Sequence, residues 1–148
     1  MRTAPPPTAR RPDPGAVQHG AGRAPTLLAS FRYAFAGIRY LLWTQRNARI
    51  HVVITLAAVA LGLVLRIERG DWLALALITG LVFVAEGFNT ALEAVVDLAS
   101  PGYHPLAKIA KDVAAGTVLL AAIAAVAVGM LVFLPYLLPI GQRWLATH

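Results

Sequence analysis

The sequence predicts an all-α integral membrane protein with one N-terminal amphipathic surface helix and three transmembrane helices. Hydrophobic residues make up 58% of the 148 residues and charged residues only 14%, which is typical of a small polytopic membrane protein. The net charge of +6 comes from basic residues that flank apolar stretches. We therefore expect a lipid bilayer, and no nucleic acid, as the anionic partner.

Residues 1–25 are predicted to be a disordered tail outside the folded domain. Five of the ten prolines lie in the first fourteen residues, and a segment so poor in apolar residues cannot form a core. It also lacks the apolar stretch of a secretory signal peptide. The chain has no cysteine, which excludes disulfides and thiolate metal sites.

Residues 26–46 have the pattern of an amphipathic helix. Apolar side chains recur with helical spacing along one face, at Phe31, Phe35, Ile38 and Leu42. A second face carries arginines seven residues apart, at Arg32, Arg39 and Arg46. This pattern indicates a helix lying in the membrane interface, with packing against other helices as the alternative.

Three apolar segments follow, and each is predicted to cross the membrane. They comprise residues 50–67, 72–98 and 112–134. Ala121, Ala125 and Gly129 in the last segment are four residues apart, a spacing that lets helices pack closely in lipid. Pro135 and Pro139 are expected to end this helix, which leaves 135–148 as a C-terminal tail.

A row of acidic and amide side chains organises the second transmembrane segment. Glu86, Asn89, Glu93 and Asp97 lie at i, i+3, i+7 and i+11, which is a single stripe on an α-helix. The apolar part before it, from Trp72, is about 21 Å long, whereas the hydrocarbon layer is about 30 Å thick. The row is therefore expected to begin just inside the far boundary and to continue into the headgroup layer.

The distribution of basic residues predicts which side of the membrane this row faces. Six basic residues flank the spans on its side, at Arg32, Arg39, Arg46, Arg49, Lys108 and Lys111, whereas the other side has Arg66, Arg69 and Arg143. The positive-inside rule then places the surface helix and the row of acids in the cytoplasm.

Several acids so close together indicate a bound cation or proton chemistry. Mg²⁺ is usually held by one or two carboxylates together with substrate phosphates, and Lys111 offers a point charge suited to phosphate. A carboxylate such as Glu86 could act as a general base. These groups favour phosphoryl transfer at the membrane surface, although intramembrane acids also serve ion pathways.

The same residues resemble the prokaryotic diacylglycerol kinase family, which includes the undecaprenol kinases. The likeness rests on the row from Glu86 to Asp97, the turn around Tyr103 and His104, and Lys111 with Asp112; segments 30–40 and 46–51 also match. It covers about residues 26–134. What it implies is a multi-pass lipid kinase of the bacterial inner membrane, a homotrimer with its active site facing the cytoplasm, which uses ATP with Mg²⁺ to phosphorylate a membrane lipid alcohol.

The resemblance also implies a role for individual residues. Glu86 is the expected catalytic base, Glu93 the expected metal ligand, and Gln45 occupies the position of a second metal-binding glutamate of the family. The nucleotide is expected to contact Tyr33, Asn89, Asp97, Gly102, Tyr103, His104, Lys111 and Asp112. The lipid substrate is expected to contact Ser30, Phe31, Arg32, Phe35, Asn47, Arg49 and His51.

Two questions stay open from the sequence. Glutamine offers only a neutral oxygen to a metal ion, so Gln45 predicts weaker Mg²⁺ binding. The acceptor that the resemblance implies is undecaprenol or diacylglycerol, and undecaprenol is favoured because His51 and the turn that follows Tyr103 look more like the undecaprenol kinase branch. There are two alternative functions. One is a proton- or ion-coupled carrier using Glu86, Glu93 and Asp97, which would need broken helices with acids at the midplane. The other is a non-catalytic scaffold.

Overall fold

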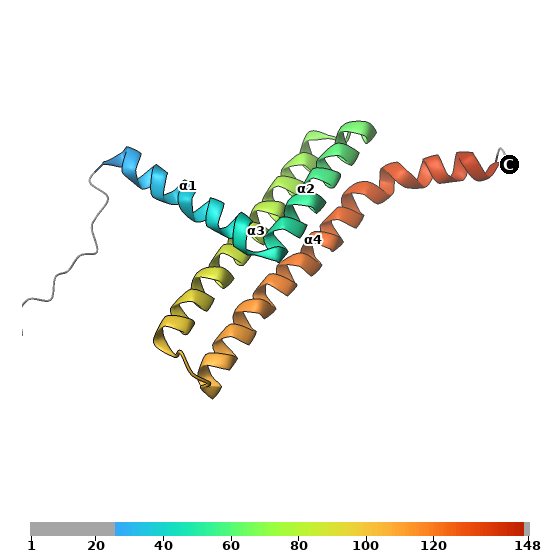
Figure 1. Ribbon diagram of the computed structural model, residues 1–148. Helices are drawn as coiled ribbons and strands as arrows, with labels where there is room; N and C mark the ends of the chain where they lie inside the picture. The colour runs from blue at the N-terminus through green and yellow to red at the C-terminus, as the bar shows by residue number, and fades with distance from the viewer. Residues whose placement is uncertain (1–25, 147–148) are drawn as a thin grey trace, which may run out of the picture. The chain divides into compact units, whose positions relative to one another are not determined.

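The computed structural model describes residues 26–146, apart from the side chains at 140, 141 and 143–146. Within that part of the chain there are four helices and no strands (Figure 1): α1 (Leu27–Thr44), α2 (Arg46–Leu65), α3 (Arg69–Ala99) and α4 (Pro105–Ala146). The predicted N-terminal tail, 1–25, lies outside the described residues. The chain separates into two compact units, Met1–Ala34 and Phe35–His148. The boundary falls inside α1, which is therefore described by itself.

Helix α1 confirms the first predicted helix. Its first turn is capped by Thr26, whose Oγ1 accepts a hydrogen bond from the backbone N–H of Ala29 at 3.2 Å. No residue of α1 is buried, and Phe31 and Phe35 are 56% and 67% exposed. That the apolar face lies in a membrane interface stays a prediction.

Helices α2, α3 and α4 confirm the three predicted transmembrane segments, since each is long and apolar enough to cross a bilayer. Helix α3 has 31 residues and is therefore about 46 Å long, more than the hydrocarbon layer of about 30 Å requires. Part of α3 must consequently extend into a headgroup layer.

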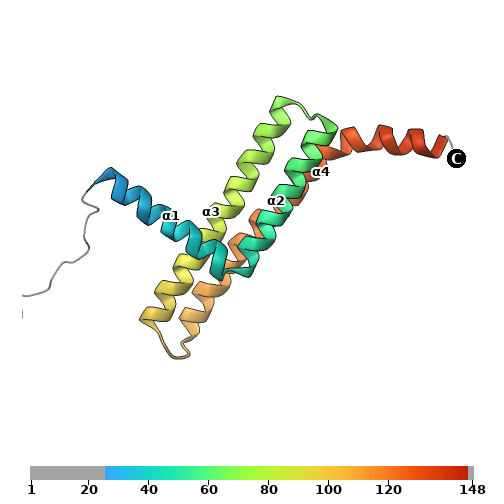
Figure 2. The ribbon, with the colours of Figure 1, turned by 45° about the horizontal axis from the view of Figure 1, so that its top comes forward.

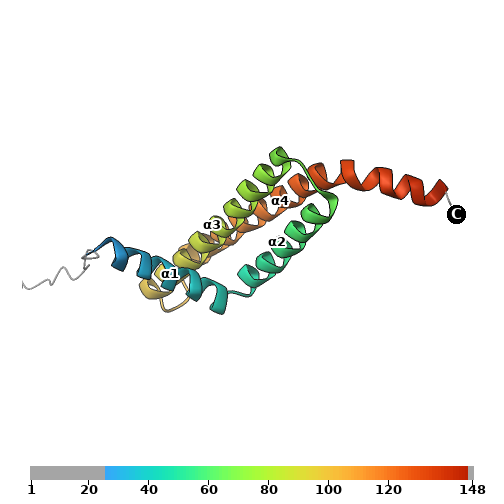
Figure 3. The ribbon, with the colours of Figure 1, turned by 90° about the horizontal axis from the view of Figure 1, so that it is seen from above.

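The two longest helices form the main packing interface of this bundle. Figures 1 and 2 show α3 and α4 running antiparallel and side by side, joined by a short turn. Helix α2 packs less extensively against both of them, and Figure 3 shows it set apart from the α3 and α4 pair. Helix α3 therefore has neighbours from two helices.

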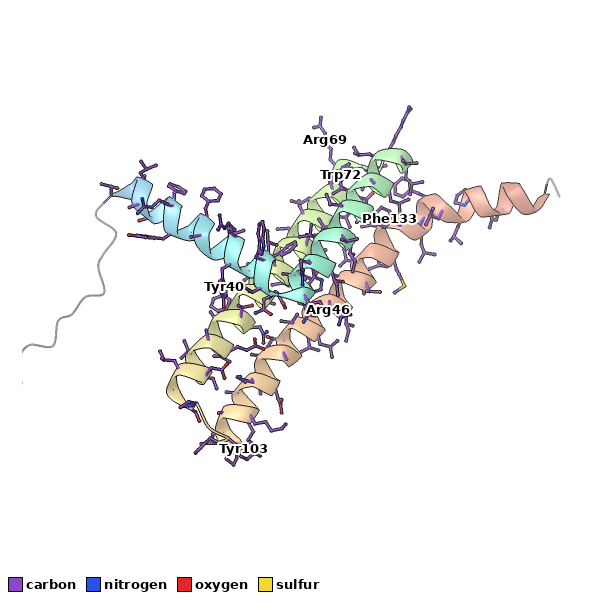
Figure 4. The ribbon with its side chains drawn as sticks, viewed as in Figure 1. Tyr40, Arg46, Arg69, Trp72, Tyr103 and Phe133 are labelled. Carbon is purple, nitrogen blue, oxygen red and sulfur yellow. The ribbon has the colours of Figure 1, made fainter. Side chains whose placement is uncertain are left out.

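The turn between α2 and α3 closes one end of the bundle. Arg66 adopts the left-handed conformation, with φ of 53°, and its backbone N–H donates to the carbonyl of Gly62. A Cβ at Gly62 would lie 2.9 Å from the side chains of Ile67 and Trp72, so only glycine permits this approach. Trp72 packs beside Phe133 in the apolar cluster at this end (Figure 4).

Helix α4 does not end where the prolines predicted. It continues through Pro135 and Pro139 to Ala146 and changes direction in its C-terminal third (Figures 1 and 2), as proline inside a helix requires. Tyr136 lies between the two prolines. Its hydroxyl accepts from the backbone N–H of Glu68 at 3.2 Å and donates to Asp71 at 2.7 Å, which attaches the continuation to the start of α3.

Candidate active site

The predicted row of polar residues lies on one unbroken helix and becomes more exposed toward its end. On α3, Glu86 is only 1% exposed and Asn89 7%, whereas Glu93 is half-buried and Asp97 is exposed. The row thus leads from the interior of the bundle to its surface. Because α3 has no break along the row, it lacks the discontinuous helix on which the carrier alternative depended.

Glu86 is the least satisfied side chain in the described part of the chain. Both of its carboxylate oxygens are buried and have no hydrogen-bond partner among residues 26–146. Its backbone carbonyl accepts from the hydroxyl of Thr90 at 2.9 Å. A buried acid without partners carries a substantial free-energy cost, which indicates that its free oxygens have a function rather than a structural task.

The next polar group on the row links Glu86 to Glu93. The side-chain N–H of Asn89 donates to Oε1 of Glu93 at 3.3 Å, one turn further along the helix. The other half of the Asn89 amide, its Oδ1, is buried and has no partner among the described residues. Three oxygens therefore lie unused in two consecutive turns of α3.

His51 of α2 is the part of the predicted lipid-binding set that reaches this row. Its ring meets the ring of Phe83 edge to face, at 6.4 Å between centroids, and Phe83 lies three residues before Glu86 on α3. Asn47 and Arg49, one turn earlier on α2, are exposed. His51 is thus the polar group that α2 brings to the buried acid.

A second group of predicted residues surrounds a cavity at the turn between α3 and α4. The cavity has a volume of about 240 Å³. Six of the eight residues expected to bind nucleotide line it: Asp97, Gly102, Tyr103, His104, Lys111 and Asp112. Figure 4 shows Tyr103 at the end of the bundle opposite to Trp72 and Phe133. Asn89 lies further back on α3, and Tyr33 is on α1.

Two ion pairs set the charge of this cavity. Lys111 contacts Oδ1 of Asp97 with its Nζ at 2.5 Å, which connects the start of α4 to the end of the acid row. Lys108 pairs with Asp112 one turn along α4. Both pairs are largely exposed, so they contribute little to stability and their lysines can exchange a carboxylate for a phosphate.

His104 has a structural task in the turn. Its Nδ1 accepts a hydrogen bond from the backbone N–H of Leu106 at 3.2 Å, and Pro105 follows as the first residue of α4. This is the arrangement of a helix N-cap with proline at the first helical position. The side chain therefore shapes the cavity from its edge.

The metal-binding prediction concerns Glu93 and Gln45. Gln45 is the N-cap residue of α2 and its side chain makes no capping bond, so its carbonyl oxygen is available. Within residues 26–146, no three His, Asp or Glu side chains converge as a ready-made metal site. Mg²⁺ needs only one or two carboxylates when phosphates complete its shell. Glu93 with the free oxygen of Asn89 fits that requirement.

The remaining predicted lipid-binding residues, Ser30, Phe31, Arg32 and Phe35, lie on α1 together with Tyr33. These assignments stay predictions.

The sequence reasoning missed one feature, an apolar cavity between α2, α3 and α4. Ala125 and Gly129, which were assigned to close helix packing, line this cavity instead. The small size of these two residues was the sequence signal for the cavity, but we interpreted it as a sign of close contact between helices.

Comparisons with known proteins place the sequence in a family. The family model described as prokaryotic diacylglycerol kinase matches residues 32–133. A diacylglycerol kinase from Synechocystis is 55% identical over 116 residues, which is 78% of this chain and 66% of that protein, just under two thirds of its length. An undecaprenol kinase from Bacillus subtilis is 39% identical over 108 residues, 73% of this chain and 88% of that protein.

Proposed function

Since the chain belongs to the prokaryotic diacylglycerol kinase family, we propose that it is a membrane lipid kinase that transfers the γ-phosphate of ATP to the hydroxyl of a membrane lipid. The observation that supports this most is Glu86, a buried acid with two unpartnered oxygens on the helix face that leads to Lys111. A base in that position can take a proton from an alcohol that reaches the interior of the bundle.

The reaction assigns one task to each end of the row. Glu86 accepts the proton of the lipid hydroxyl as the hydroxyl oxygen attacks the γ-phosphorus. The bond between that phosphorus and the β–γ bridging oxygen breaks, ADP leaves, and the phosphorylated lipid is released into the bilayer. Lys111 exchanges Asp97 for the phosphates and neutralises charge that develops on them.

ATP is proposed to bind as its magnesium complex, in the cavity between the end of α3 and the start of α4. Mg²⁺ supplies charge neutralisation on the phosphate oxygens when bound. In this chain Glu93 would hold it, Asn89 would orient Glu93 and face the phosphates, and Gln45 would offer a neutral oxygen. Gly102 and Tyr103 would border the nucleotide.

The acceptor is proposed to be undecaprenol, with diacylglycerol as the second candidate. His51, beside Glu86, and the turn from Tyr103 to Lys108 favour the undecaprenol kinase branch. The relatives that the chain matches have both names, so the two lipids must be compared directly. Offering both alcohols at equal concentration in mixed micelles, and measuring labelled product from each, decides between them.

The assembly and its place in the cell complete the proposal. We infer a homotrimer in the bacterial inner membrane, with the acid row and the nucleotide cavity at the cytoplasmic side. The excess of basic residues at that side of the spans supports the orientation. Native mass spectrometry in detergent would give the number of subunits.

The direct test is phosphate transfer from γ-labelled ATP to a lipid extract by the purified protein. We expect Glu86→Gln to lose at least about two orders of magnitude in rate, the usual size of a general-base effect. Glu68→Gln is the matched control, since this acid caps the other end of α3 and its side chain makes no capping bond. An unchanged rate in Glu86→Gln would exclude Glu86 as the base.

A further inference from the structure

An apolar cavity of about 250 Å³ lies between the three membrane-spanning helices, apart from the nucleotide cavity. Its walls come from α2, α3 and α4, and Phe133 lines it toward the end opposite to Tyr103 (Figure 4). Two lining residues, Ile54 on α2 and Val126 on α4, remain 59% and 62% exposed. In the single chain the cavity is therefore partly open at these two residues, on α2 and α4.

Small residues on α4 create this space. Ala122, Ala125 and Gly129 line it at helical spacing, and a Cβ built on Gly129 would meet no atom within 4 Å. Gly62 shows the contrast, because there a Cβ would approach two side chains at 2.9 Å. If a gap of this size stays empty, the side chains around it lose many dispersion contacts. This cost favours an apolar occupant.

The polar groups in the wall do not make it hydrophilic. Thr55 donates its hydroxyl to the carbonyl of His51 in its own helix at 2.7 Å, so it turns no donor toward the cavity. Thr79 is the other hydroxyl in the wall, and His51 marks one end. A hydrocarbon chain therefore suits this wall, and His51 offers a hydrogen-bonding group for its polar end.

The cavity ends about one helical turn before the acid row. The α3 side of the wall includes Leu75, Thr79 and Val82. Glu86 lies on the same face of α3, four residues after Val82. Four residues of helix span about 6 Å. His51 belongs to the cavity wall, and its ring meets the ring of Phe83, three residues before Glu86 on α3. A molecule in the cavity thus has its end nearest His51 about one turn of α3 from the proposed base.

The volume limits what fits. A cavity of about 150 Å³ holds one benzene molecule, so this one has room for roughly ten carbon atoms. That is one chain of about two isoprene units, not two acyl chains side by side. An alcohol with its hydroxyl at the end of a single chain can occupy the cavity and reach Glu86 at once. A diacylglycerol would have to leave one chain outside.

We propose that this cavity binds the first two isoprene units of a polyprenyl alcohol and thereby delivers its terminal hydroxyl to Glu86. The proposal rests on the lipid kinase function and specifies its acceptor as a single-chain prenol. It predicts that kcat/KM of the wild-type protein rises with prenol length up to about ten carbons and is flat beyond, because longer chains extend into the bilayer.

The test fills the cavity without disturbing the backbone. Gly129→Leu places a side chain in the open space, and Gly80→Leu on α3 is the matched control, since that glycine also has no neighbour within 4 Å and is not in the cavity wall. The acceptors are C5, C10, C15 and C55 prenols and diacylglycerol. We expect Gly129→Leu to raise KM for the C15 and C55 prenols at least tenfold and to change KM for C5 and diacylglycerol less than threefold.

The results separate this proposal from the function on which it rests. If the wild-type protein phosphorylates no alcohol, the lipid kinase function fails. If it does so, but Gly129→Leu leaves the dependence on prenol length unchanged, the cavity proposal alone is overturned. An equal rise in KM for diacylglycerol would overturn the assignment to a single-chain alcohol.

A second experiment needs only the wild-type protein and does not depend on how a variant folds. A farnesol with a photoreactive diazirine in its second isoprene unit is expected to label peptides containing residues 51–58 or 122–133. Labelling confined to other segments would contradict the proposal. Because the chain has no cysteine, Gly129→Cys can also report a second copy in the cavity. A disulfide between copies at that position would overturn the prenol assignment.

Discussion

The ion pair between Lys111 and Asp97 allows a prediction that separates stability from catalysis. The Lys111→Met variant removes the charge and keeps most of the apolar stem. Lys111 and Asp97 side chains are 37% and 65% exposed, and pairs this exposed stabilise a fold by about 0–1 kcal/mol. The free energy of unfolding should therefore fall by no more than about 1 kcal/mol.

The effect on phosphate transfer should be larger. A hydrogen bond to a charged group contributes about 1.5–3 kcal/mol, and since every 1.4 kcal/mol is tenfold, kcat/KM for ATP should fall by about 10- to 150-fold. Initial rates of labelled-lipid formation over a range of ATP concentrations give this number, and thermal unfolding in the same micelles gives the stability.

The control for Lys111→Met is Arg69→Met, which removes one positive charge at the opposite end of the bundle, where Figure 4 shows Arg69 directed away from the helices. It should leave kcat/KM within about twofold, since exposed charges separated by more than about 10 Å are largely screened. A loss of less than threefold in Lys111→Met, or the same loss in both variants, would refute the assignment of Lys111 to the phosphates.

Three further predictions concern single residues. Tyr136→Phe removes two hydrogen bonds, one with the backbone N–H of Glu68 and one with the carboxylate of Asp71. It should lower the free energy of unfolding, measured by thermal unfolding in micelles, by about 2 kcal/mol. A decrease below about 0.5 kcal/mol would contradict a stabilising role for these bonds. Arg66→Gly relieves a left-handed residue and should raise stability by about 0.5–1 kcal/mol; a loss would show that the arginine side chain matters more. Gln45→Glu should lower the Mg²⁺ concentration for half-maximal activity several-fold, and no change in a Mg²⁺ titration would place Gln45 outside the metal site.

The helices were predictable because apolar length and periodicity determine them. The spans α2 and α3 lie within four residues of the predicted limits. The end of α4 was not predictable from the sequence, since proline normally ends a helix in water. Here α4 bends and continues through its prolines, and Tyr136 forms a hydrogen bond to Asp71 at the start of α3. A hydrogen bond between positions 65 residues apart leaves no local trace in a sequence.

The site was predictable where it lies on one helix. The spacing of Glu86, Asn89 and Glu93 was enough to place them on one face, and the structure shows which of their oxygens are free. The pairing of Lys111 with Asp97 depends on the turn geometry and could not be derived from spacing.

The apolar cavity was the least predictable feature. Alanine and glycine at intervals of four residues are compatible both with close helix contact and with a gap. Ala121 is buried by packing, whereas Gly129 faces open space. Only the placement of α2 against α3 and α4 distinguishes the two cases.

The measurement that tests the role of Glu86 most directly is the rate of the chemical step in a single turnover. Protein in excess is mixed with labelled MgATP and saturating lipid alcohol, and phosphorylated lipid is followed over time. Glu86→Gln should bind both substrates as the wild-type protein does and form product at least about 100-fold more slowly, whereas Glu68→Gln should match the wild type. Product formed by Glu86→Gln at the wild-type rate would contradict the assignment of the buried acid as the base.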